Sequence, residues 1–290
     1  MERYRDIVDR MPRFARQNDD IDAVVVVGSQ SRREMPADEY SDLDVVIFCS
    51  NPQKYLDHAA WLEQFGDVVC TFVEPTIGGH TERRVLFSDN RDIDITVLPA
   101  FAACSEDLLS DAAMLEVLRN GYVVVYDKTT KVEAAFAHTL ATVVRSHVAA
   151  VSNDTLNQLV GDVHYHVVWA IKKLLRGELW TAVSCINSYL VPRLLRMLSY
   201  ERAVQNESDH RRYGRLVDTE LSQDLRDQLA RCVSRYDRNE AHRALGALFE
   251  AFNRLAQTVY ERAGYAFPEG QRAEVVRLIH AIDEEHTAER

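Results

Sequence analysis

Two apolar segments with a polar stretch between them place the strongest constraint on the fold of this chain. They are Ala23–Val27, which runs into a Gly-Ser pair, and Leu43–Phe48, which is entered through Asp42 and Asp44. Short apolar runs bounded by turn residues are typical of buried strands. Paired carboxylates at the mouth of a buried strand are costly unless positive charge lies against them. The pattern therefore predicts two core strands that carry a charged site.

The rest of the N-terminal part alternates between helical and extended patterns. Apolar residues at helical spacing predict a helix over Tyr4–Gln17, and Gly66 ends a short helical pattern in "DHAAWLEQFG". Further strands are expected at "VVCTFVE", at a hairpin in "RRVLFSDNRDIDITVLP" with its turn at Ser88–Arg91, and at an edge strand in "YVVVYDK". This predicts a small mixed sheet flanked by helices, over residues 1–132.

The pattern changes after this point. Residues 133–290 contain long segments with apolar positions three and four apart and no convincing strand, which predicts a helical bundle. The proline in "SYLVPRLLRML" is expected to start or kink a helix. The fold class is therefore α+β, with a mixed-sheet domain followed by a helical domain.

Composition limits the possible partners and location. The net charge of −11 argues against a nucleic-acid polymer as the partner, whereas an acidic cleft would attract a cationic small molecule. Five scattered cysteines without zinc spacing favour a reduced, cytoplasmic protein. No window approaches the roughly 18 apolar residues of a membrane span, and no signal core follows the N-terminus. We expect a cytoplasmic monomer with no membrane partner.

The carboxylates indicate the chemistry. Asp42 and Asp44 project from one face of an extended segment about 7 Å apart, and Asp94 lies on another apolar strand. If the two strands are neighbours, three carboxylates converge, which suits Mg²⁺ bound to substrate phosphates. Two such ions can assist an in-line displacement, and the turn at Gly28 and Ser29 offers N–H groups and a hydroxyl to phosphates. The ordered combination predicts a nucleotidyl-transfer site.

The sequence resembles the aminoglycoside 6-adenylyltransferases, or streptomycin adenylyltransferases, of the polymerase-β-like nucleotidyltransferase superfamily. The Gly-Ser and Asp-x-Asp elements alone are typical of the superfamily. The motifs that carry the resemblance are "GSQSR", "SDLDV", "WLEQFG", "DITVLP", "KKLLRGELW" and "VPRLLRML". The resemblance covers most of the chain and implies transfer of AMP from Mg-ATP to a hydroxyl of a streptomycin-like aminoglycoside, which inactivates the antibiotic.

The resemblance also implies roles for residues of the first domain. Ser29, with Gly28, would contact the triphosphate, and Asp42 and Asp44 would hold magnesium, two ions being expected. Asp94 would complete the carboxylate cluster and act as the general base on the attacking hydroxyl, because an alcohol of high pKa needs a positioned base.

The resemblance also implies site residues in the second domain, and this chain departs from the family at one position of the first domain. Lys172 matches a family lysine whose ammonium would reach the phosphates. Asp162 aligns with a family Glu and would bind a guanidinium or ammonium of the acceptor, and His166 is a candidate for the acceptor pocket. Where the family usually has Arg after Gly-Ser, this chain has Gln30. Its phosphate contact is either lost or taken over by Arg32 or Arg33.

Two alternatives remain open at the level of sequence. The acceptor could be a lincosamide, another metabolite or a protein side chain. In the other alternative, the chain is a non-catalytic ATP-binding regulatory or antitoxin-like protein. The three aspartates argue against the second, because a scaffold has no use for a costly carboxylate cluster.

Overall fold

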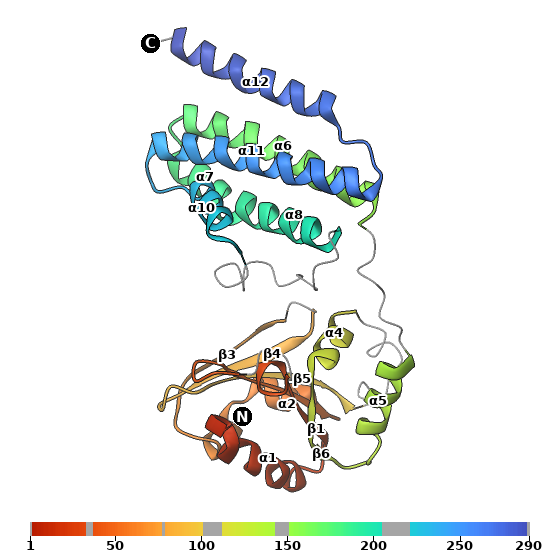
Figure 1. The fold of residues 1–290 in the computed structure, drawn as a ribbon. Helices are drawn as coiled ribbons and strands as arrows, with labels where there is room; N and C mark the ends of the chain where they lie inside the picture. Colours follow the sequence, from red (N-terminus) through yellow and green to blue (C-terminus); the bar gives the residue numbers. More distant parts are fainter. Residues whose placement is uncertain are drawn as a thin grey trace. The chain divides into compact units, whose positions relative to one another are not determined.

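The computed structural model describes residues 2–32, 37–76, 79–100, 112–142, 151–204 and 221–288 (Figure 1). Contacts within the chain group it into two compact units, residues 1–145 and 146–290. Helix α5 (Val132–Thr142) thus belongs with the first unit, whereas the sequence analysis placed the domain boundary at its start. Arg33 lies outside the described residues.

The first unit is built on one mixed sheet of the order β3-β4-β5-β2-β1-β6. The pair β2–β5 is parallel and every other neighbouring pair is antiparallel. The predicted hairpin and the predicted edge strand, β6, are confirmed. The strands are β1 (Ile21–Val27), β2 (Leu43–Cys49), β3 (Val68–Pro75), β4 (Thr81–Phe87), β5 (Asp92–Pro99) and β6 (Val123–Asp127).

Helices pack on both faces of the sheet at β1 and β2 (Figure 1). On one face α1 (Arg5–Gln17) packs its Phe14 into a cluster that includes Val24 of β1. On the other face α4 (Ala112–Asn120) and α5 pack against the alternate residues of β1 and β2. This double burial explains why the two strands read as unbroken apolar runs.

The helix expected up to Gly66 is instead two short elements. They are α2 (Pro52–Asp57) and the 3₁₀ turn η3 (Ala60–Gln64). The extended backbone of His58, with φ −119° and ψ 138°, separates them. The break allows the ring of Trp61 to stack on the ring of Phe14 of α1, with the ring centroids 5.3 Å apart. Aromatic packing therefore overrides the local helical pattern.

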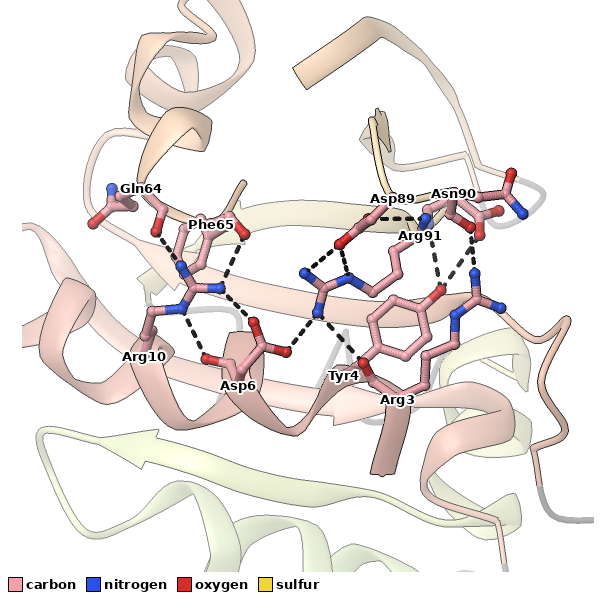
Figure 2. A network of polar contacts seen from close by, with 10 residues as sticks. Arg3, Tyr4, Asp6, Arg10, Gln64, Phe65, Asp89, Asn90 and Arg91 are labelled. Atoms are coloured by element: carbon pink, nitrogen blue, oxygen red, sulfur yellow. Dashed lines mark hydrogen bonds and ion pairs between the residues drawn. The ribbon is translucent and has the colours of Figure 1, made fainter. Parts of the chain in front are cut away.

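A polar network fixes α1 to the turn between β4 and β5 (Figure 2). Arg91 of the turn donates to Asp6 at 2.5 Å and pairs with Asp89 at 2.7 Å. The Tyr4 hydroxyl lies 3.3 Å from the backbone nitrogen of Asp92 and accepts its hydrogen bond. These contacts hold the start of β5, the strand that carries the third predicted carboxylate.

The second unit is helical, as predicted. Its elements are α6 (Asn153–Leu175), α7 (Leu179–Ser184), the π turn η5 (Cys185–Leu190), α8 (Val191–Val204), α10 (Gln223–Cys232), α11 (Arg238–Ala263) and α12 (Glu269–Ala288). Pro192 lies at the second position of α8, directly after the π turn. Proline has no N–H to donate there, which accounts for the helix restarting at this point. Within the described residues, no helix combines the length and apolarity needed to cross a bilayer.

A buried histidine, His164, joins three helices of this unit. Its Nε2 lies 2.8 Å from Oδ1 of Asn253 on α11, and its Nδ1 lies 3.2 Å from Nε2 of Gln271 on α12. The Asn253 amide nitrogen donates to the Phe249 carbonyl, so its oxygen faces the imidazole. Nε2 therefore carries the proton and Nδ1 accepts. Burial lowers the pKa of His164 below its ordinary value.

This histidine makes the stability of the protein depend on pH. The native state holds His164 neutral, whereas the unfolded chain protonates it near its ordinary pKa of about 6.5. The contribution of His164 to the free energy of unfolding is therefore fully present above about pH 6.5. It is lost as the pH drops towards the folded pKa, by at most about 1.4 kcal/mol per pH unit. Urea unfolding of wild type and His164→Gln between about pH 5 and pH 7.5 measures this slope, which we expect to shrink in the variant.

Exposed His280 on α12 provides the matched control, because His280→Gln should keep the wild-type slope. An unchanged slope in His164→Gln would assign the pH dependence to other groups.

Candidate active site

The turn after β1 is a 3₁₀ turn, η2 (Gly28–Gln30). Gly28 has a φ of 68°, which glycine adopts at little cost. The Ser31 hydroxyl donates to the Gly121 carbonyl at 2.8 Å, and a Cβ on Gly121 would lie 2.2 Å from the Ser31 carbonyl oxygen. The connection between α4 and β6 therefore braces the turn. The Ser29 hydroxyl is buried and has no hydrogen-bond partner in the described part of the chain, which suits a phosphate oxygen as its ligand.

The three aspartates converge beside this turn. Asp44 of β2 and Asp94 of β5 are direct neighbours in the parallel pair, and Asp42 comes two residues before Asp44. One carboxylate oxygen from each lies within 4.8 Å of the other two. A Cβ on Gly28 would lie 1.8 Å from Oδ2 of Asp44, so the turn and the carboxylates are in contact. The prediction that these two strands are neighbours in one sheet is confirmed.

Asp94 has an unusual electrostatic environment. Burial raises its pKa to about 6, Arg84 opposes this shift, and Glu82 and Asp42 add to it through repulsion. Its side chain is 12% exposed, and Oδ2 lies 3.2 Å from Nη1 of Arg84. A carboxyl with a raised pKa is a stronger base than an ordinary aspartate once it is ionised.

The donor set fits a divalent cation. Three carboxylates within ligand distance of one another repel unless a positive charge lies among them. Their oxygens are the ligands that Mg²⁺ prefers, and Mg²⁺ usually binds through one or two carboxylates together with substrate phosphates. Asp42, Asp44 and Asp94 could therefore hold the metal, beside the Ser29 hydroxyl, which has no partner among the residues that the structure describes.

Gln30 is structural in this chain. It is 8% exposed, and its Nε2 donates to the backbone carbonyl of Asp42 at 2.9 Å. Gln30 therefore ties the η2 turn to the backbone of the first aspartate. Arg32 follows the turn and is half-buried. Its predicted contact with phosphate stays a prediction.

The remaining predicted residues lie on α6 of the second unit. Lys172 is exposed. Asp162 and His166 are brought together, with 2.8 Å between Oδ1 and Nδ1. Asp162 also accepts hydrogen bonds from the Tyr189 hydroxyl at 2.9 Å and from Nε of Arg193. Asp162, which was predicted to bind a cationic group of the acceptor, is thus already paired with the guanidinium of Arg193. Burial raises the pKa of Asp162, but the Arg193 and Tyr189 hydrogen bonds outweigh it and the pKa is lowered.

Sequence reasoning missed the residues that surround Asp94. Arg84 is its direct partner across the β4–β5 pair, and Glu82 is two residues from Arg84 on the same face. The expected turn at Ser88–Arg91 would place Arg84 opposite Ile95. The observed hairpin closes one residue earlier, where the Phe87 N–H donates to the Arg91 carbonyl, and this register places Arg84 opposite Asp94.

A strand that ends in a Gly-Ser turn, one aspartate just before the next strand, a second on that strand and a third on its neighbour form the arrangement that the sequence predicted for nucleotidyl transfer. The family model described as streptomycin adenylyltransferase matches residues 1–282. The chain belongs to this family, and it is a nucleotidyltransferase.

Individual relatives are distant in sequence. An aminoglycoside 6-adenylyltransferase of Bacillus subtilis (strain 168) is 22% identical over 279 residues, which is 93% of this chain and 94% of the relative. One of Campylobacter jejuni is 21% identical over 206 residues, 69% of this chain and 67% of the relative. Among solved structures, an aminoglycoside 6-adenyltransferase from Bacillus subtilis aligns over 94% of this chain and 96% of its own, with a TM-score of 0.46 and 19% identity.

A second solved structure, a nucleotidyltransferase-like protein from Exiguobacterium sibiricum 255-15, aligns over 87% of this chain and 78% of its own. Its TM-score is 0.37 at 8% identity.

Proposed function

We propose that this protein transfers AMP from Mg-ATP to a hydroxyl of a streptomycin-like aminoglycoside and so inactivates the antibiotic. The observation that supports this most is the convergence of Asp42, Asp44 and Asp94 within 4.8 Å, beside the Gly28 turn. Family membership supports the same reaction class, and both relatives described above carry the name aminoglycoside 6-adenylyltransferase.

The residues of the first unit would divide the work between the nucleotide and the attacking hydroxyl. The η2 turn and the Ser29 hydroxyl bind the terminal phosphates, where backbone N–H groups and a hydroxyl stabilise negative charge. Asp42 and Asp44 hold magnesium, two ions being expected, and the bound metal would neutralise charge on the phosphates during displacement. Asp94 accepts the proton of the acceptor hydroxyl while that oxygen bonds to the α-phosphorus. The bond from the α-phosphorus to pyrophosphate breaks, and pyrophosphate leaves.

Residues of α6 would serve the phosphates and the acceptor. Lys172 is exposed, and its ammonium would pair with the triphosphate. Asp162 and His166 would meet the acceptor, whose cationic group would exchange with the guanidinium of Arg193 on Asp162. The net charge of −11 favours the approach of a polycation over that of a nucleic acid.

An acceptor panel tests the proposal. The protein is incubated with ATP, Mg²⁺ and, in separate reactions, streptomycin, other aminoglycosides or a lincosamide, and pyrophosphate release is followed. We expect release with streptomycin and a product heavier by one AMP in mass spectrometry. Pyrophosphate release only with a non-aminoglycoside acceptor would overturn the proposed acceptor, but the proposed nucleotidyl transfer would stand. ATP binding without release on any acceptor would favour the regulatory alternative.

A further inference from the structure

One arginine lies between the carboxylate cluster and two further acids. Arg84 on β4 contacts Oδ2 of Asp94 through Nη1 at 3.2 Å, Glu82 through Nη2 at 3.0 Å and Glu74 through Nε at 2.5 Å. The three carboxylates come from β5, β4 and β3, so one guanidinium joins three adjacent strands. Its side chain is 43% exposed, so this face of the sheet is open to solvent at Arg84.

The register of the sheet explains this arrangement. Arg84 is paired with Asp94, and Asp94 is paired with Asp44, so the guanidinium and two of the cluster carboxylates stand in one row across the sheet. Glu74 and Glu82 form the next pair on the same face, two residues along their strands. The planar fork of an arginine can contact several carboxylates in fixed directions, which the point charge of a lysine cannot do.

Arg84 has two effects on Asp94. It binds one carboxylate oxygen of Asp94 in a fixed direction. This contact orients the side chain and leaves its other oxygen for other contacts. It also places a positive charge next to the cluster that is proposed to bind a divalent cation, and like charges repel. The first effect favours turnover, and the second lowers the affinity for the metal.

We propose that Arg84, anchored by Glu74 and Glu82, is a positioning residue that orients the Asp94 carboxylate for proton transfer at the expense of metal affinity. The inference rests on the proposed function, because it assigns Asp94 the role of base. Arg84 itself touches none of the reacting atoms in this assignment and acts through Asp94.

The variant Arg84→Gln separates the two effects. We expect kcat for pyrophosphate release to fall by about tenfold to a hundredfold, because a misplaced base lowers turnover to this extent. The KM for ATP should stay near the wild-type value. Binding of Mn²⁺ alone, measured by electron paramagnetic resonance of the unbound ion, should tighten by about threefold or more once the competing charge is gone. Arg84→Lys should recover part of kcat and lose the tightening.

Two controls guard against a general structural effect. Arg5→Gln removes an exposed arginine on α1 and should change neither kcat nor Mn²⁺ binding. Glu74→Gln removes an anchor and leaves the guanidinium in place, and it should lower kcat less than Arg84→Gln does. Because Glu74 acts through Arg84, the double variant should be no slower than Arg84→Gln alone.

The outcomes are separable. Unchanged kcat in Arg84→Gln, weaker or unchanged Mn²⁺ binding in a folded variant, or additive losses in the double variant would each overturn the role of Arg84. Mn²⁺ binding needs no acceptor, so it tests this inference even if no aminoglycoside supports turnover of the wild-type protein. In that case the acceptor assignment fails, and the Mn²⁺ result alone decides for or against Arg84.

Discussion

Replacing Asp94 by asparagine should lower kcat for pyrophosphate release by about a thousandfold, within the range usual for loss of a general base. The amide cannot accept the proton of the acceptor hydroxyl at neutral pH, although it keeps the size of the side chain. Asp42, Asp44 and the η2 turn remain, so binding of Mg-ATP should be largely retained. Steady-state pyrophosphate release and calorimetric titration with Mg-ATP measure the two effects separately.

Asp92→Asn is the matched control. Asp92 lies two residues earlier on β5, and its backbone nitrogen donates to the Tyr4 hydroxyl. It is not part of the aspartate cluster in the described residues. We expect turnover within about threefold of wild type, since the same substitution made outside the cluster leaves the base in place. Full activity in Asp94→Asn would remove the assignment of Asp94 as the base, and loss of Mg-ATP binding would make its main role that of a metal ligand.

Replacing Gly28 by alanine should have the second large effect. The added Cβ would lie 1.8 Å from Oδ2 of Asp44, so the carboxylate or the turn must move. We expect kcat/KM for ATP to fall by about a hundredfold, because a displacement of about 1 Å in a reacting assembly costs this much. Mn²⁺ affinity should fall in parallel. Pyrophosphate release and Mn²⁺ titration measure both.

Alanine at Gly28 also strains a left-handed backbone, and Gly264→Ala controls for this. Gly264 has a φ of 75°, but a Cβ there would meet no atom within 4 Å. Both variants should lose about 1–2 kcal/mol of stability from the left-handed conformation, whereas only Gly28→Ala should lose metal affinity. Equal losses of activity in the two variants would show that backbone strain, not the contact with Asp44, is responsible.

Much of the architecture could be predicted from local sequence. The apolar runs of β1 and β2 are buried on both faces, so their composition alone indicated core strands. The hairpin of β4 and β5 follows from two strand patterns around a polar turn. The long helices α6 and α11 follow from spacings of three and four. The helix expected up to Gly66 was predicted less well, because the stacking of Trp61 on Phe14 depends on a contact between distant segments.

The candidate site divides in the same way. What the sequence by itself determined is the order of Gly28, Ser29 and the three aspartates and their position beside apolar strands, and from this pattern it predicts that they carry the chemistry. Only the tertiary structure decided that β2 and β5 are parallel neighbours, which brings Asp44 and Asp94 side by side. It also decided the partners of these residues: Gln30 on the Asp42 carbonyl, and Arg84 on Asp94. The physical reason is that these contacts join residues far apart in sequence. A local pattern can predict a hairpin between consecutive strands, but it does not specify which distant strands will pair or in which register.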